Sequence, residues 1–402
     1  FYSTVVCCQL TMKRPTLLKK VASLVAVSSG SFALFSSINI YQNNENFYQN
    51  IFLPILFKFD AETAHNIAML AMNHKLLPKS SYVDPPQLGS QLWHLKFPNP
   101  LGIAAGFDKQ AEGIETLHHI GFGFVEIGSV TPEPQPGNDK PRVFRLEKNN
   151  AIINRFGFNS DGHQAVYERV KAIHSKNFEG VIGINLGKNK ESLDPVDDYV
   201  KGIKKFGDVA HYFVINVSSP NTLNLRKLQG KDQFKHLLKA VVDARSQLSV
   251  RPLPPLLVKI APDISQSERK DIAEVVLDSK CKVDGLIVSN TTIDRYEYLD
   301  PKYKGEAGGL SGEPLKDKST ELIFEMYKLT KGNMPIIGVG GVFSGKDAYE
   351  KIKAGASLVQ IYTSFVYHGP PLVTRIKAEL QELLQEDGYT SIAQAVGTAH
   401  KS

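Results

Sequence analysis

The chain has 402 residues, of which 42% are hydrophobic and 22% charged, a balance typical of a globular protein with a large core. Its formal net charge is +6, and residues 1–20 hold four basic and no acidic side chains. The rest is nearly neutral, which argues against a nucleic-acid-binding surface, because such a surface needs clustered Lys and Arg. Three cysteines, Cys7, Cys8 and Cys281, provide neither a disulfide framework nor a CxxC metal site, so we expect no metal.

The chain opens with this basic stretch, and residues 21–44 that follow carry no charge. Met12 is a candidate translation start, which would place residues 1–11 upstream of the native protein. An uncharged run of this length can cross about 30 Å of hydrocarbon as a helix. We therefore predict a basic targeting segment over residues 1–20 and a transmembrane helix over residues 21–44. A cleaved secretory signal is the alternative, and the lack of a cysteine framework downstream argues against it.

Residues 45–90 have a helix-like pattern, with apolar side chains at three- and four-residue spacings such as Ile51, Ile55 and Phe59. Prolines between residues 78 and 86 close the segment and indicate a domain boundary near residue 90. Two short helices beside a membrane span can be a structural cap or the mouth of an apolar tunnel for a lipid-soluble partner. The pattern leaves both interpretations open.

Beyond residue 90, short β-rich apolar runs alternate with helical stretches, which is typical of βα units around a parallel sheet. The eight predicted strands are residues 101–105, 124–128, 181–186, 212–217, 256–260, 285–289, 335–339 and 358–362. The helices predicted between them are residues 111–120, 164–174, 196–206, 232–248, 267–279, 315–330 and 345–354. Such a series predicts an α/β protein with a (β/α)8 TIM barrel over residues 91–402. An open doubly wound sheet is the alternative, but no GxGxxG follows the first strand.

Four predicted strands end in polar side chains where the pattern calls for apolar ones, namely Asn185, Asn216, Lys259 and Asn290. Burying an unpaired amide costs about 1 to 3 kcal/mol, and an unpaired ammonium costs more. Any one of these residues is equally well explained as a hydrogen-bonded core residue. Four of them near the carboxyl ends of barrel strands, where this fold builds its active sites, indicate a shared polar ligand.

Glycines cluster after the sixth strand and at the end of the seventh, at Gly308, Gly309, Gly312, Gly338, Gly340 and Gly341. Glycine lets backbone amides approach a ligand closely, and TIM barrels commonly bind phosphate around the last two strands. Tight turns would explain either cluster alone. Together with Tyr362 and Thr363 after the eighth strand, the clusters favour one phosphate site, and hence a mononucleotide.

The fourth strand ends in Asn216-Val-Ser-Ser-Pro-Asn221 and runs into a polar loop over residues 222–230, which we interpret as a lid. Ser219 is a poor base by itself, so proton abstraction would need a relay or water and a nearby positive charge. Lys109, after the first strand, is a candidate for that charge. No partnered His and Asp accompany Ser219, which argues against a hydrolase.

Ten ordered motifs resemble those of the class 2, quinone-dependent dihydroorotate dehydrogenases, closest to the mitochondrial animal type. The motifs are AAGFDK (104–109), EIGSVTP (126–132), INRFGFNSDG (153–162), GINLGKNK (183–190), INVSSPN (215–221), VKIAPD (258–263), SNTT (289–292), GGLSG (308–312), GVGG (338–341) and QIYTS (360–364). The resemblance implies an FMN enzyme that oxidises (S)-dihydroorotate to orotate with ubiquinone as acceptor, in de novo pyrimidine (UMP) biosynthesis. It also implies a single-pass anchor in the mitochondrial inner membrane, and a quinone tunnel within residues 45–90.

By this resemblance, Ser219 would take a proton from C5 of dihydroorotate while the C6 hydride passes to N5 of FMN, with Lys109 as the second catalytic residue. The residues that would bind the substrate are Lys109, Asn154, Arg155, Phe156, Gly157, Phe158, Asn216, Asn221, Asn290 and Thr291. Those that would bind FMN are Ala104, Ala105, Gly106, Phe107, Asp108, Ser129, Asn185, Asn216, Lys259, Ser289, Ser311, Gly312, Gly340, Gly341, Tyr362 and Thr363. Lys259 would supply positive charge near the flavin N1 and O2 edge.

The resemblance further implies that His65, Arg145 and Tyr362 line the quinone tunnel, although His65 is equally well explained as a helix-packing residue. Three other functions stay open from the residues alone. A 2-hydroxy-acid oxidase would use a histidine as base, and the strand-end motifs hold none. A phosphate-sugar isomerase or aldolase would use Lys259 as a Schiff-base former and carry no flavin. An inactive membrane-tethered binding module would fold without dihydroorotate-dependent bleaching of flavin.

Overall fold

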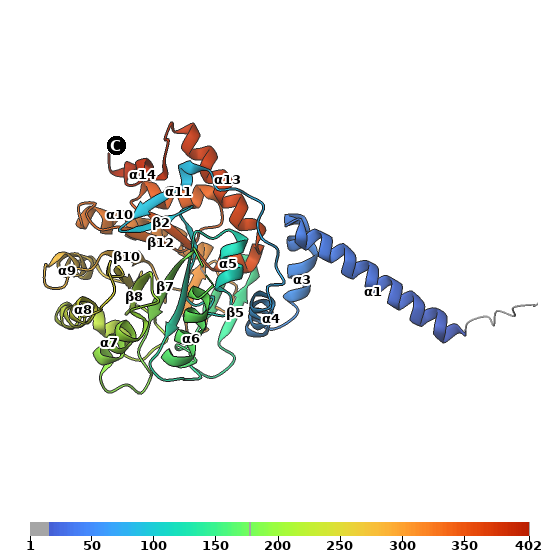
Figure 1. Cartoon of the computed structure of the whole chain (residues 1–402), viewed down its shortest axis with the longest axis horizontal. Helices are drawn as coiled ribbons and strands as arrows, with labels where there is room; N and C mark the ends of the chain where they lie inside the picture. Colours follow the sequence, from blue (N-terminus) through green and yellow to red (C-terminus); the bar gives the residue numbers. More distant parts are fainter. Residues whose placement is uncertain (1–15, 177, 402) are drawn as a thin grey trace, which may run out of the picture.

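A computed structural model describes residues 16–176 and 178–401, and Figure 1 shows a barrel from which one long helix projects. That helix, α1 (Leu17–Tyr41), has 25 residues and a mean hydropathy of 1.7 over its most apolar 18 residues. It is long and apolar enough to cross a membrane, and that window is not buried. The helix begins before residue 21 and ends before residue 44. The first 15 residues of the predicted targeting segment lie outside the described residues.

Short helices connect α1 to the barrel. The first three are α2 (Glu45–Phe47), a π-helical turn η1 (Tyr48–Phe52) and α3 (Leu53–Leu56), which share a small apolar cluster. Helix α4 (Ala61–Asn73) is capped by Asp60, whose carboxylate accepts hydrogen bonds from the first-turn amides. Its Met69 and Met72 belong to the main core, so α4 packs directly on the barrel.

The barrel is closed by eight parallel strands, as predicted. Their order around the barrel is β10 (Gly285–Val288), β12 (Ile336–Val339), β13 (Leu358–Ile361), β3 (Leu101–Ile103), β4 (Phe124–Val130), β7 (Val181–Leu186), β8 (Tyr212–Asn216) and β9 (Leu256–Ile260). The last strand pairs with the first, with Val359 opposite Leu101. This pairing excludes the open doubly wound sheet, because an open sheet leaves two unpaired edges.

Helices surround the barrel at the predicted places. They are α5 (Ile114–Ile120), α6 (Gly162–His174), α7 (Pro195–Phe206), α8 (Lys231–Ser246), α9 (Gln266–Leu277), α10 (Lys316–Leu329) and α11 (Gly345–Lys353), followed by α12 (Thr363–His368), α13 (Pro371–Glu386) and α14 (Ile392–Ala395). Helix α5 begins three residues later than predicted, since Ala111 has a positive φ of 62° that no helix accommodates. Helix α9 begins with a capping box between Ser265 and Glu268.

Two small sheets were not predicted. The hairpin β1 (Ser90–Leu92) and β2 (Leu95–Phe97) packs Phe97 against Phe124 and so helps to fill one end of the barrel. The second sheet is antiparallel and comprises β5 (Val143–Leu146), β6 (Ala151–Asn154) and β11 (Gly309–Gly312). Gly309 faces Asn154 in this sheet, and a Cβ on Gly309 would lie 1.9 Å from the hydroxyl of Thr291. The glycine there permits close strand packing, whereas its cluster was predicted to contribute to a phosphate site.

Candidate active site

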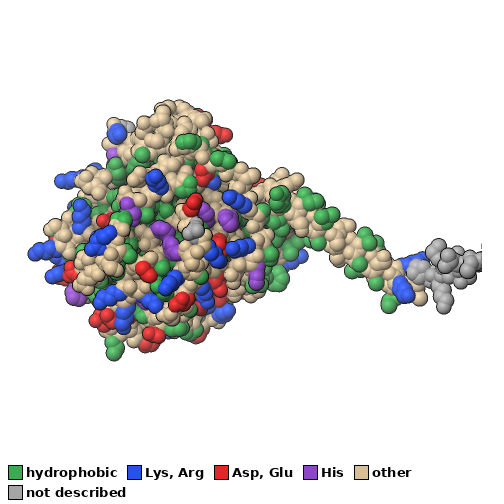
Figure 2. Space-filling view, in the orientation of Figure 1, with side chains coloured by type: hydrophobic (Ala, Val, Ile, Leu, Met, Phe, Trp, Pro, Cys, Tyr) green, Lys and Arg blue, Asp and Glu red, His purple; other side chains and the backbone are tan. Residues whose placement is uncertain are grey.

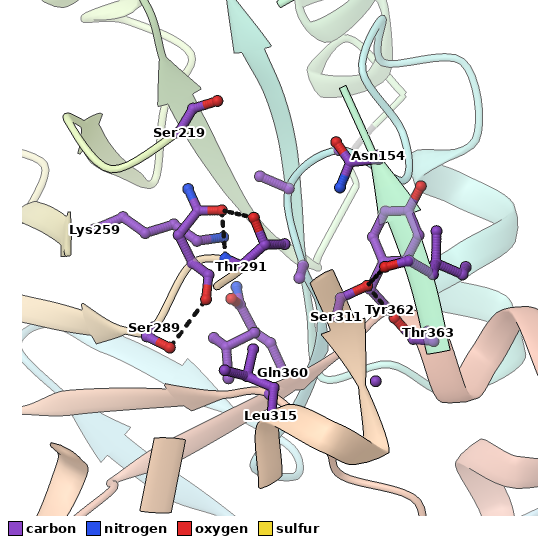
Figure 3. A pocket seen from close by; sticks show the side chains of 18 of the residues that line it. Asn154, Ser219, Lys259, Ser289, Thr291, Ser311, Leu315, Gln360, Tyr362 and Thr363 are labelled. Atoms are coloured by element: carbon purple, nitrogen blue, oxygen red, sulfur yellow. Dashed lines mark hydrogen bonds between the residues drawn. The ribbon is translucent and has the colours of Figure 1, made fainter. Parts of the chain in front are cut away.

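A cavity opens at the carboxyl ends of the barrel strands, and Figure 3 shows side chains from several elements converging on it. Most of the predicted site residues line it. They are Ala104, Ala105, Gly106, Lys109, Ser129, Asn154, Phe156, Gly157, Phe158, Asn216, Ser219, Asn221, Lys259, Ser289, Asn290, Thr291, Ser311, Gly312, Gly340, Gly341, Tyr362 and Thr363. Residues as far apart in the chain as Ala104 and Thr363 therefore face one space.

Four predicted contacts lie outside this lining, namely Phe107, Asp108, Arg155 and Asn185. The carboxylate of Asp108 is fully buried and accepts hydrogen bonds of 2.9 and 2.8 Å from the amides of Glu112 and Gly113. It therefore stabilises the loop before α5, and burial raises its pKa to about 6. Arg155 points elsewhere, toward Glu306 at 2.6 Å.

Asn185 instead belongs to a buried hydrogen-bond network centred on Glu126. One carboxylate oxygen of Glu126 accepts from the amide of Asn185 at 2.8 Å, and the other accepts from Gln360 at 2.7 Å and from Tyr212 at 3.3 Å. All four residues are fully buried. The network joins β4, β7, β8 and β13, and it fixes the orientation of the Asn185 amide.

The same network continues to the cavity wall. Ser129 donates to the side-chain oxygen of Asn185 and accepts from Asn216 at 2.8 Å. The amide of Asn290 then donates to Asn216 at 3.3 Å and to Ser218 at 2.9 Å. The polar residues at the strand ends are thus oriented by one another, which leaves little freedom at the wall that a ligand would meet.

Two polar groups at the base of the cavity lack a protein partner among the described residues. The ammonium of Lys259 makes no hydrogen bond or ion pair there, and burial lowers its pKa although the charge of Glu126 opposes this. The side-chain oxygen of Gln360 is buried and also accepts no hydrogen bond. Unpaired buried polar groups are costly, so both point to a polar ligand such as the pyrimidine edge of a flavin.

Backbone conformation shapes the opposite end of the cavity. Gly340 and Gly341 have positive φ values of 124° and 68°, and a Cβ on Gly341 would lie 2.4 Å from the Cβ of Lys316. Glycine is therefore required at position 341, and the backbone there lines the cavity directly. The hydroxyls of Ser311 and Thr363 lie 2.8 Å apart beside it. This set of small polar groups fits a phosphate.

Ser219 and Lys109 lie on the wall above this base. The hydroxyl of Ser219 accepts a hydrogen bond of 3.3 Å from the backbone amide of Asn221, and none of the described titratable side chains is hydrogen-bonded to it. The ammonium of Lys109 lies over the Phe156 ring, and burial lowers its pKa to about 8. The side-chain amide of Asn221 donates to the side-chain oxygen of Asn154 at 3.2 Å, so these two side chains form a continuous part of the cavity wall.

A second, apolar cavity lies between the N-terminal helices and the barrel. His65, Arg145 and Tyr362 line it, together with Phe107 and the small side chains of α4. The His65 ring meets the Phe107 ring edge-on at 5.2 Å, and burial lowers the His65 pKa to about 3. Tyr362 lines both cavities. An apolar molecule entering beside α4 would therefore reach the wall of the first cavity.

Glu126 and Gln360, which orient the buried network, were not among the predicted site residues. Both are polar residues inside apolar strands, the same signal that identified Asn185 and Lys259. It was not applied to them because they lie in the middle of their strands rather than at the ends. Within residues 16–176 and 178–401, no three His, Cys, Asp or Glu side chains are grouped so that they could hold a metal ion.

Comparison with known proteins gives one consistent result. Residues 87–384 match the family model described as dihydroorotate dehydrogenase. The mitochondrial dihydroorotate dehydrogenase (quinone) of Mus musculus is 47% identical over 391 residues, 96% of this chain and 98% of the mouse protein. The Oryza sativa protein of the same description is 50% identical over 373 residues, 87% of this chain and 79% of the rice protein. The crystal structure of DHODH from Eimeria tenella in complex with ferulenol superimposes with a TM-score of 0.83 at 42% identity, covering 87% of this chain and 99% of that one.

Proposed function

Since the chain belongs to the dihydroorotate dehydrogenase family, we propose that its two cavities are the two substrate sites of one enzyme. The protein oxidises dihydroorotate with a quinone as acceptor, a reaction of pyrimidine biosynthesis. Relatives from mouse, rice and Azorhizobium caulinodans are 47%, 50% and 48% identical. These similar values support the quinone-dependent type as a whole, and an animal type rests on the motifs alone.

FMN is the cofactor we propose for this flavin-dependent family. Gly340, Gly341 and Thr363 would hold its single phosphate, and Lys259 and Gln360 would meet the polar edge of its ring system. The unpartnered ammonium and amide oxygen at the base of the cavity support this assignment. When bound, the flavin supplies a hydride acceptor that can afterwards be reoxidised.

Dihydroorotate lies on the wall opposite this base. Lys109 pairs with its carboxylate, and the amides of Asn154, Asn216 and Asn221 hold the ring. Ser219 accepts the proton from C5, with water as its relay, because none of the described titratable side chains is hydrogen-bonded to it. The observation that carries this proposal is that Ser219, Lys109 and Lys259 line one cavity, from the loops after β8 and β3 and from β9.

The apolar cavity is the route for the quinone, for which ubiquinone is the candidate. Residues 45–90 form the tunnel domain, with His65, Arg145 and Tyr362 in its wall, and residues 91–402 form the FMN-binding barrel. Helix α1 is the single-pass anchor, preceded by a targeting segment, and the mitochondrial inner membrane is its location. The unburied apolar surface of α1, visible in Figure 2, and the mitochondrial relatives support this location.

An anaerobic titration of the purified protein tests the function directly. Stoichiometric dihydroorotate should bleach the flavin absorption band, and a short-chain quinone added afterwards should restore it. A protein without a flavin band, or one whose band dihydroorotate leaves unchanged, would contradict the proposal. Restoration by oxygen but not by the quinone would contradict the assignment of the apolar cavity.

A further inference from the structure

Arg226 lies in the loop that follows β8, on a single 3-10 turn over Leu225–Gln229 (η4). Its guanidinium contacts three loops at once. Nε donates to the carbonyl of Ser218 at 3.0 Å, Nη2 donates to the carbonyl of Thr291 at 2.9 Å, and Nη1 donates to the carboxylate of Asp263 at 2.9 Å. These acceptors follow β8, β10 and β9, so one side chain joins the ends of three neighbouring strands.

Several other hydrogen bonds hold the carboxylate of Asp263 in place for its contact with Arg226. Its carboxylate also accepts from Lys318 at 2.6 Å, from the hydroxyl of Thr292, and from the amide of Ile293 at 3.0 Å. Burial by itself would raise the pKa of Asp263, but the hydrogen bonds led by Lys318 hold the pKa below its ordinary value. The carboxylate is 10% exposed, and its second ion pair, with Lys318, holds it in place independently of Arg226.

The anchored atoms are next to the reacting groups. Ser218 directly precedes Ser219, and Thr291 lines the cavity, whereas Arg226 does not line it. The rest of the loop has few other attachments. Leu223 is 75% exposed, and the hydroxyl of Thr222 is buried without a partner among the described residues. The remaining anchors are the buried Leu225 and the buried Gln229, whose side-chain oxygen accepts a hydrogen bond of 3.1 Å from the backbone amide of Ala261.

We propose that Arg226 is a positioning residue whose ion pair with Asp263 latches residues 222–230 across the ends of β8, β9 and β10. This ion pair and the two accompanying hydrogen bonds fix the backbone positions of Ser219 and Thr291. This inference rests on the proposed role of Ser219 as the proton acceptor. A lysine at position 226 keeps the charge but cannot reach all three acceptors, because its donors radiate from one nitrogen.

The experiment compares Arg226→Lys, Arg226→Ala and Asp263→Asn with the full-length, FMN-loaded wild type. The matched control is Arg245→Ala, which breaks an ion pair with Asp284 just ahead of β10, at the amino end of that strand and away from the cavity. Rapid mixing with dihydroorotate gives the flavin reduction rate, and mixing with a short-chain quinone gives the reoxidation rate. We expect reduction to slow roughly 10- to 100-fold in the Arg226 variants, since small misplacements of reacting groups cost that much. Reoxidation should stay unchanged.

Hydrogen exchange supplies a readout that needs no turnover. Amides of residues 218–230 should exchange faster in the Arg226 variants, while those of β3 and β4 keep their protection. Added guanidinium should restore part of the reduction rate of Arg226→Ala. An Arg226→Lys variant that matches Arg245→Ala in both reduction and exchange would overturn the latch. If the wild type itself is not reduced by dihydroorotate, the proposed function fails, and exchange alone then decides whether the latch exists.

Discussion

The ammonium nitrogen of Lys109 lies 3.7 Å from the centre of the Phe156 ring, and both side chains line the cavity that also contains Ser219. The ring face attracts the cation without neutralising it. Burial lowers the Lys109 pKa to about 8, and the nearby charge of Glu62 opposes part of that effect. The group is therefore charged at neutral pH but titrates within the working range of an enzyme.

This pKa predicts how the protein binds orotate, which carries a carboxylate. Only the protonated lysine attracts that anion, so affinity should be constant below about pH 8 and fall about tenfold for each pH unit above it. Orotate titrations followed by the flavin spectrum would measure the slope. Lys109→Arg should remove it, because arginine stays protonated. An unchanged slope in that variant would show that another group titrates.

Ser219→Ala should leave FMN bound and slow flavin reduction by dihydroorotate by about two orders of magnitude or more, the scale of a general base. Among the described residues the hydroxyl has one hydrogen-bond partner, the backbone amide of Asn221, so its loss removes little structure. Rapid mixing under anaerobic conditions measures the rate. Ser192→Ala, in the loop after β7, is a control that should reduce normally. Normal reduction by Ser219→Ala would remove Ser219 from the proposed role.

The features that produce a periodic pattern of apolar residues could be predicted from the sequence. The eight strands and the polar residues that end them stand out because an apolar run makes Asn216 or Lys259 conspicuous. The antiparallel sheet of β5, β6 and β11 did not, since its strands have four residues each and β11 pairs with β6, which is distant from it in sequence. The contacts of Arg226 could not be predicted either, because a charged residue in a polar loop is usually exposed to solvent. Only the fold places the loops after β9 and β10 beside it.

The apolar cavity predicts a variant that separates the two half-reactions. Ala68 of α4 lines this cavity, and a tryptophan there would occupy it. Overpacking an apolar site costs about 1 to 3 kcal/mol, so the KM for a quinone should rise about tenfold or more. Thr63→Trp, on an exposed position of the same helix, is the control. Flavin reduction by dihydroorotate should be unchanged in both, and slower reduction in Ala68→Trp would mean that the cavity is not a separate quinone route.

Removal of residues 1–44 should give a soluble protein that still oxidises dihydroorotate with an artificial dye as acceptor. Helix α1 makes little contact with the rest of the protein. The ring of Phe35 lies 5.7 Å from that of Phe47, and Asn39 is the one buried residue of the helix. The core of the barrel therefore stays intact. Reoxidation by a long-chain quinone held in vesicles should fall, because the anchor keeps the tunnel mouth at the membrane. Centrifugation and the dye assay test both outcomes, with the full chain as control. Loss of dye reduction in the truncated protein would show that α1 belongs to the catalytic fold rather than to the anchor.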